Sequence, residues 1–114
     1  MNGTKGIALG VLLAASMPCM AYTGNDLQEW AQDLEAARKT QSITWKGSML
    51  VGYVAGVAET IKGVIICPKG MQTHLQNAAI VSKYLEQNPE RWSENGATLV
   101  TAALRAAYPA CEKR

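Results

Sequence analysis

The chain has 114 residues, of which 48% are apolar and 18% are charged, and its formal net charge is +2. This length fits a single domain. Because apolar residues are frequent and the net charge is small, the composition argues against an intrinsically disordered chain. The Lys and Arg residues form no cluster of the kind that nucleic-acid binding requires, so we expect no nucleic-acid partner.

The first 21 residues have the pattern of a cleaved secretory signal. Lys5 supplies the positive charge, and the apolar stretch over 6–15 is too short to span a bilayer. Pro18 then precedes Cys19-Met20-Ala21, which predicts cleavage after Ala21. Acylation of Cys19 is the alternative, but the residues before it are bulky where a lipoprotein signal has small ones. We therefore expect a mature domain over 22–114, with no membrane segment after cleavage.

The cysteines predict one disulfide. Cleavage of the signal removes Cys19 and leaves Cys67 and Cys111 in a chain that reaches an oxidising compartment. We expect these two residues to pair. In the chain-entropy model, closing a loop of this length stabilises a protein by about 3–4 kcal/mol.

Apolar residues recur at helical spacing in four stretches, which predicts an all-α bundle of four main helices. The first helix begins near Asp26, after a cap at Thr23 or Asn25, and ends at Lys39. Its predicted inner stripe is Leu27, Trp30, Ala31, Leu34 and Ala37.

The second helix covers 45–62 and is apolar around most of its circumference, so we expect it at the centre of the bundle. Gly52 and Gly56 lie on one of its faces, which predicts that another backbone comes close there. Gly63 is expected to end the helix in a left-handed cap.

The stretch over 64–68 is expected to be a buried connector that delivers Cys67 to the core. Thr73 and Gln76 have the spacing of a capping box, which predicts the start of a third helix. The third helix has the predicted inner face Leu75, Ala78, Ala79, Val81, Tyr84 and Leu85. Asn88-Pro89 stops that helix. The fourth helix runs over about 97–107, with Leu99, Val100, Ala103, Leu104 and Ala107 inward.

The sequence offers little that favours catalysis. His74 lies at the first position of the third helix, where we expect it on the surface with no group to orient it. Gly47-Ser48 lacks the flanking glycines of a hydrolase motif. Glu86, Glu90 and Glu94 are four residues apart, but Pro89 interrupts their register, so a solvated face is expected. Zinc-ligand spacings and phosphate-binding loops are absent as well. We therefore predict a protein that is not an enzyme and needs no metal or cofactor.

Trp92 is the best clue to a binding role. It lies in a polar joint over 91–96, and tryptophan next to arginine is typical of the residues that dominate interface energies. The alternative is that Trp92 folds back over the edge of the bundle. Trp45, at the start of the second helix, leaves the same two possibilities open.

Four motifs, in order along the chain, resemble the Rap/Tai family of periplasmic immunity proteins against peptidoglycan amidase effectors of type VI secretion. They are Gly52-Tyr53-Val54-Ala55-Gly56-Val57-Ala58-Glu59, Ile66-Cys67-Pro68-Lys69-Gly70, Tyr84-Leu85-Glu86-Gln87-Asn88-Pro89-Glu90-Arg91, and Ala102-Ala103-Leu104 with Tyr108-Pro109-Ala110-Cys111. The resemblance extends over about 27–111. One departure is that Leu50 or a neighbour stands where family members commonly have a cysteine, so a second disulfide is missing.

The resemblance implies a small, all-helical periplasmic protein that often forms a homodimer. It also implies a partner, a papain-like Cys/His amidase that cleaves the peptide stems of peptidoglycan. Family members block the active-site groove of this amidase, and they protect the producing cell and its kin.

An inhibitor of this kind needs a rigid scaffold and a segment that enters the groove. We predict that the joint from Glu90 to Gly96 is this segment, with Asn95-Gly96 as a projecting turn. The predicted effector-binding residues are Glu90, Arg91, Trp92, Ser93, Glu94 and Asn95, with Lys69, Gln72 and His74 as a second patch.

Two other functions stay open at this point. A periplasmic acid-stress chaperone is also small, helical, secreted and held by one disulfide, and it acts by exposing apolar surface when low pH dissolves a dimer. A structural accessory protein of the envelope is the third possibility.

Overall fold

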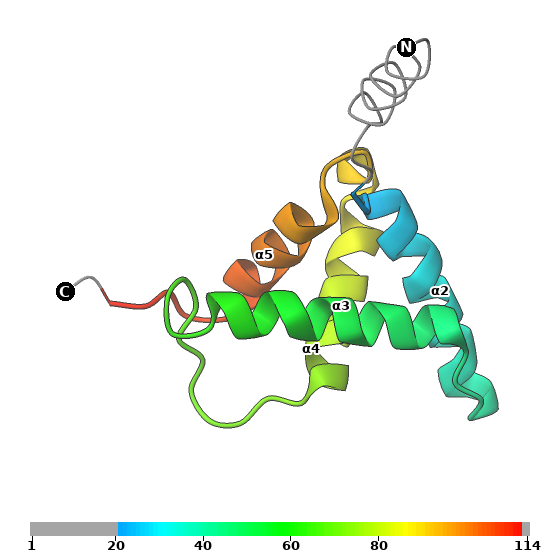
Figure 1. The fold of residues 1–114 in the computed structure, drawn as a ribbon, viewed down its shortest axis with the longest axis horizontal. Coiled ribbons are helices and arrows are strands. Elements are labelled where there is room, and N and C mark those ends of the chain that lie inside the picture. Colours follow the sequence, from blue (N-terminus) through cyan, green and yellow to red (C-terminus); the bar gives the residue numbers. More distant parts are fainter. Residues whose placement is uncertain (1–20, 113–114) are drawn as a thin grey trace, which may run out of the picture.

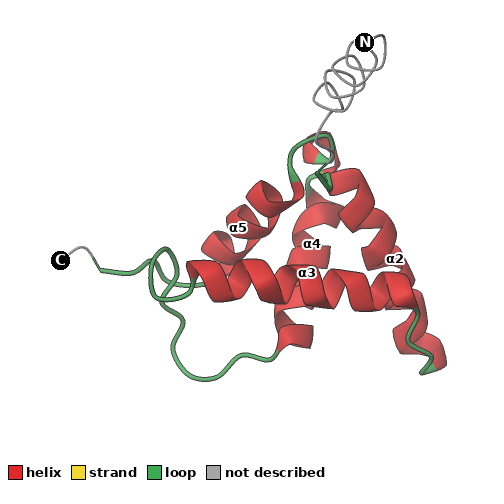
Figure 2. Ribbon diagram, viewed as in Figure 1, coloured by secondary structure: helices red, strands yellow, loops and turns green. Residues whose placement is uncertain are grey.

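The computed structural model describes residues 21–112, which form four α-helices and one short 3-10 helix. The elements are α2 (Gly24–Thr40), α3 (Trp45–Ile61), α4 (His74–Gln87), η1 (Pro89–Arg91) and α5 (Gly96–Ala107). Extended pairing within the described range is limited to isolated bridges, so the prediction of an all-α fold with four main helices is confirmed (Figures 1 and 2). Residues 1–20 of the predicted signal lie outside the described residues.

A polar residue directly before each α-helix satisfies amide groups that the helix itself leaves without acceptors. At α2, the backbone N–H of Thr23 donates to the carboxylate of Asp26 at 2.8 Å, which selects Thr23 from the two predicted caps. The other three caps are Thr44 before α3, Thr73 before α4 and Asn95 before α5, and each accepts through its side chain. The caps therefore fix where the helices begin.

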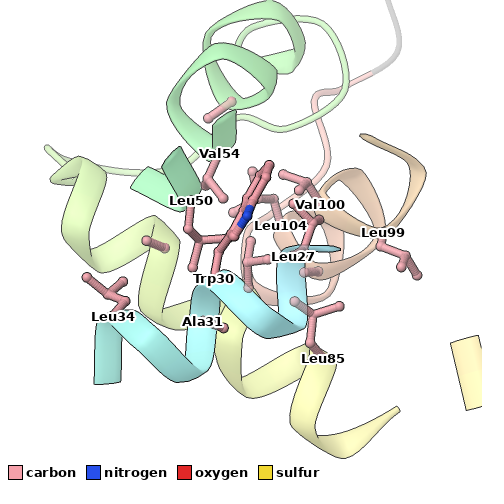
Figure 3. Packing of buried hydrophobic residues seen from close by; sticks show 14 of the residues in the cluster. Leu27, Trp30, Ala31, Leu34, Leu50, Val54, Leu85, Leu99, Val100 and Leu104 are labelled. Carbon is pink, nitrogen blue, oxygen red and sulfur yellow. The ribbon is translucent and has the colours of Figure 1, made fainter. Parts of the chain in front are cut away.

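The core lies where α3 crosses the other three helices, each of which contacts it (Figure 1). The predicted inner stripe of α2 is buried in full. Figure 3 shows Trp30 of α2 among Leu50 and Val54 of α3 and Val100 and Leu104 of α5. Its ring also meets Tyr53 edge to face, with ring centres 6.1 Å apart.

The helix α3 has the predicted central position, because α2, α4 and α5 all contact it. It is not buried all round, however, and the prediction of another backbone against its glycines is wrong within the described residues. Leu50, Val54, Ala58 and Ile61 form one buried stripe of the helix. The backbone at Gly52 and Gly56 is exposed, and a Cβ at either position would have no heavy atom within 4 Å. The helix is therefore covered on one side and open on the other.

Two residues predicted to point inward are exposed because they lie at helix ends, beyond the reach of the core. Leu75 is the second residue of α4 and is 55% exposed. Ala107 is the last residue of α5 and is also exposed.

The predicted buried connector is buried only at Ile66, while Val64 and Cys67 are exposed. The reason is that α3 ends at Ile61 and the chain turns at Gly63, which has a positive φ of 82° and lies beyond the extended residue that ends the helix. The predicted disulfide between Cys67 and Cys111 is confirmed. It joins the segment after α3 to the tail after α5, near the surface and not in the core.

Candidate partner-binding surface

The joint between α4 and α5 is held by side-chain hydrogen bonds to the last carbonyls of α4. Proline has no N–H, so the carbonyl of Leu85 lacks the donor that a continuing helix would supply. The indole Nε1 of Trp92 donates to this carbonyl at 2.8 Å. The side-chain Nδ2 of Asn88 donates to the preceding carbonyl, that of Tyr84, at 2.7 Å. These contacts fold the joint back onto the end of α4.

Trp92 is held from the other side by the start of α2. The backbone N–H of Asn25 donates to the carbonyl of Trp92 at 2.8 Å, and that of Gly24 donates to the carbonyl of Glu94 at 3.0 Å. A Cβ at Gly24 would lie 2.7 Å from the Cα of Trp92, so glycine is required for this approach. The half-buried indole also packs against the core. Trp92 therefore folds back over the bundle edge, the second of the two possibilities left open by the sequence.

Arg91 and Glu94 satisfy each other within the joint. The guanidinium donates to the carboxylate through Nε at 2.6 Å and through Nη2 at 2.9 Å. Arg91 also donates to the hydroxyl of Tyr84 and lies 5.7 Å from the centre of its ring. The hydrogen bond from Arg91 lowers the pKa of Glu94, and the same bond raises the pKa of Arg91. Both groups are charged at neutral pH and brace the joint.

The side chains of the joint that remain exposed are those of Glu90, Ser93 and Asn95. The Oδ1 of Asn95 accepts from the backbone N–H of Ala97 at 3.0 Å and so caps α5. Gly96 is the buried first residue of that helix. The prediction of a projecting Asn95-Gly96 turn is therefore wrong, because this pair begins a helix.

The second predicted patch lies on the loop before α4. The side-chain Nε2 of Gln72 donates to the carbonyls of Lys69 and Gly70 at 3.0 and 2.9 Å, which closes the loop on itself. Gly70 has a positive φ of 79° that favours glycine. His74 is the exposed first residue of α4, as predicted. Gln72 and His74 also line a hollow of about 150 Å³ beside Tyr108.

The structure does not bring the two predicted patches together. The joint follows the C-terminal end of α4, and the loop with Lys69 and Gln72 precedes its N-terminal end (Figure 1). A helix of 14 residues is about 21 Å long. One copy of the chain therefore presents two separate polar surfaces.

Sequence reasoning missed an apolar surface at the start of α3. Ile43 is 74% exposed and Trp45 is 68% exposed. Together with Leu75, Ile43 borders a hollow of about 460 Å³ whose lining is Leu34, Ile43, Gly47, Ser48, Val51, Gly52 and Leu75. The sequence holds two signals of this surface, an apolar Ile43 in a predicted connection and Trp45 at the predicted start of a helix. Neither shows by itself that the side chain is exposed.

A hollow of about 910 Å³ lies between α2 and α4 and is bordered by charged side chains of both signs, among them Glu35, Arg38, Lys83 and Glu86. Within residues 21–112, no three His, Cys, Asp or Glu side chains are grouped so that they could hold a metal ion. Over the same range, no helix has the length and apolar character needed to cross a membrane.

Two comparisons with known proteins bear on this surface. Residues 23–111 match the family model of the Rap1a immunity proteins. A search among curated proteins finds no match.

Proposed function

The chain belongs to the Rap1a family of immunity proteins, and from this we propose that it binds and inhibits a peptidoglycan amidase effector of type VI secretion. The proposed site of action is the periplasm, which the chain would reach through the signal over 1–21. The proposed partner is a papain-like Cys/His amidase whose active-site groove the immunity protein occludes. The mature protein, over 22–114, is proposed to act as a homodimer without catalysing a reaction itself.

The family match over 23–111 is the observation that carries this proposal, and the build of the joint supports it. A binding surface loses less conformational entropy on association when it is already ordered. The joint is ordered by its contacts to α4, to α2 and between Arg91 and Glu94. It is therefore suited to enter a groove without rearranging.

We assign different roles to the residues of the proposed contact segment from Glu90 to Asn95. Trp92, Arg91 and Glu94 hold the segment, because their side chains are engaged within the chain. The exposed Glu90 and Ser93 are the groups proposed to touch the amidase. Lys69, Gln72 and His74 form the second proposed contact, about one length of α4 away from the first.

The test uses the mature, oxidised protein and an amidase effector encoded by a neighbouring gene. We expect a complex on size-exclusion chromatography and loss of peptidoglycan hydrolysis. Ser93→Arg should raise the dissociation constant at least tenfold, because a long charged side chain replaces a small one at the contact. Gln32→Arg, at an exposed position of α2, is the matched control and should bind like the wild type. Ser93→Arg with unchanged affinity would remove this segment from the interface.

A second candidate function, an acid-stress chaperone, is favoured by exposed apolar side chains. Met71 is 99% exposed and Val64 is 74% exposed. Exposed apolar side chains bind unfolded clients where they form a contiguous patch. The two functions separate in an assay of client aggregation at low pH without amidase, in which an immunity protein should give no protection.

A further inference from the structure

The hollow of about 150 Å³ beside Tyr108 lies where four parts of the chain meet. Its walls are the C-terminal end of α3, the segment that follows it, the first turn of α4 and the tail after α5. The disulfide between Cys67 and Cys111 joins two of these parts, and the backbone N–H of Cys67 donates to the carbonyl of Pro109 at 2.8 Å. The walls of the hollow are therefore held in place by a covalent bond.

Asn77 gives this hollow a polar group with an unused donor. It lines the hollow, and with 8% exposure it is the one buried polar side chain within residues 21–112. Its Oδ1 accepts from the hydroxyl of Tyr108 at 2.6 Å, whereas its Nδ2 has no hydrogen-bond partner among the same residues. A buried amide without a partner costs free energy, and a ligand with an acceptor would supply the missing bond.

Two helix ends of opposite polarity border the hollow. The carbonyl end of α3 is electronegative, and the N–H end of α4 is electropositive. Glu59 lies in the last turn of α3, Lys62 directly follows that helix and His74 begins α4. All three side chains line the hollow, and none of them forms an ion pair within the described part of the chain. The hollow thus presents a negative group and positive groups side by side.

The volume and the apolar lining limit the ligand to a small molecule. A cavity of about 150 Å³ holds benzene, which has six heavy atoms, and alanine has the same number. Ala58 and Ile66 are both buried and line the hollow, so they offer contact to a methyl group. A larger side chain would extend beyond the walls.

We propose that this hollow binds a small zwitterionic α-amino acid of the size of alanine. The carboxylate accepts from Nδ2 of Asn77 and lies near Lys62 and the start of α4, while the ammonium group pairs with Glu59. The C-terminal residue of a peptide shares the carboxylate, but its nitrogen carries no charge to match Glu59. The inference goes beyond the proposed function and does not rest on it, because it concerns binding in the absence of an amidase.

The test is a titration of mature, oxidised, ¹⁵N-labelled protein with alanine, followed by amide chemical shifts. We expect saturable shifts at the backbone amides of 74–77 and at the side-chain amide of Asn77, without comparable shifts on α2. Lactate has a hydroxyl in place of the ammonium group, and alanyl-alanine has its ammonium group one residue away from its carboxylate. Both should bind at least fivefold more weakly than alanine.

Asn77→Asp tests the donor. The substitution replaces Nδ2 by a negatively charged oxygen that repels the carboxylate of the ligand, and it keeps an acceptor for Tyr108. We expect at least tenfold weaker binding of alanine. Circular dichroism should be unchanged, because a carboxylate is favourable in the first turn of a helix. Asn25→Asp makes the same change at an exposed position in the first turn of α2 and should bind alanine like the wild type.

Glu59→Gln tests the contact with the ammonium group. This exposed position tolerates the change, so the fold should be kept. The variant should bind alanine more weakly and lactate as the wild type does, so that the difference between the two ligands disappears.

Each result decides one part of the inference. Absence of saturable shifts at the hollow, or equal affinity of Asn77→Asp and wild type, overturns the site. Lactate that binds as tightly as alanine overturns the zwitterion as the ligand. Alanyl-alanine that binds as tightly as alanine assigns the hollow to the end of a peptide and overturns the free amino acid.

Discussion

At the scale of single residues, Trp92 connects the joint to the C-terminal end of α4 through one side-chain hydrogen bond. Pro89 supplies no N–H to the Leu85 carbonyl, which accepts instead from the backbone N–H of Asn88 at 3.2 Å and from the indole of Trp92 at 2.8 Å. The same residue accepts from Asn25 through its own carbonyl. Trp92 therefore joins α2 and α4.

Substitution of Trp92 should lower the free energy of unfolding, because its side chain is engaged within the chain. We expect Trp92→Ala to lower the free energy of unfolding by about 3 kcal/mol, near the lower end for a large aromatic side chain because the indole is only half-buried. Trp92→Phe keeps an aromatic ring, smaller than the indole, and removes the donor, and loss of the hydrogen bond should cost about 1 kcal/mol. Urea denaturation followed by circular dichroism measures both. Equal stability of wild type and Trp92→Ala would contradict this role.

Residue-scale features could be predicted from the sequence where one local rule decides them. Thr73 caps α4 and His74 is exposed, as their positions at a helix start indicate. The prediction of a turn at Asn95-Gly96 was wrong because this pair is suited both to a tight turn and to the start of a helix. Packing of Gly96 against Tyr22 and Tyr53, far away in the sequence, selects the helix.

At the scale of elements, the glycines of α2 and α3 have opposite surroundings, crowded at Gly24 and open at Gly52 and Gly56. The backbone of Trp92 lies against Gly24, so a side chain there would collide with it. The glycines of α3 face open space in one copy. Composition alone does not distinguish these cases, and for that reason the predicted close approach at Gly52 and Gly56 was wrong within the chain.

Substitution by alanine should therefore change the free energy of unfolding in opposite directions at Gly24 and Gly56. Gly24→Ala should lower the free energy of unfolding by about 1–3 kcal/mol through overpacking. Gly56→Ala should raise it by about 0.5–1 kcal/mol, because alanine favours the helix and fits the open space. The comparison is made by urea denaturation at concentrations at which the protein is monomeric. Destabilisation of the monomer by Gly56→Ala would show that something in the chain covers this face.

At the scale of the whole molecule, the tail after α5 closes the fold. The backbone N–H of Cys67 donates to the carbonyl of Pro109 at 2.8 Å, next to the disulfide with Cys111. The hydroxyl of Tyr108 donates to Oδ1 of the buried Asn77 at 2.6 Å. The tail thus joins α4 and the segment after α3.

Removal of the disulfide should lower stability without changing the helices. The two cysteines are 44 positions apart, for which the chain-entropy model gives about 4 kcal/mol. The double variant Cys67→Ser with Cys111→Ser should lose about that much in urea denaturation and keep its helical circular dichroism signal. A loss below about 1 kcal/mol would show that the hydrogen bonds of the tail suffice.

The helix count, the buried stripe of α2 and the disulfide pair could all be predicted, because periodicity and the cysteine count determine them. The arrangement of the proposed contact residues could not. Their exposure depends on which helix end lies over which neighbour, and the separation of the two patches depends on α4 lying between them.

Whether the protein inhibits an amidase is measured by a single titration. Mature protein is added in steps to a fixed concentration of an amidase effector encoded by a neighbouring gene, and the release of cleaved peptidoglycan stems is measured. Hydrolysis should fall to zero near one immunity chain per amidase. Hydrolysis that continues unchanged in an excess of folded, oxidised protein would contradict this expectation.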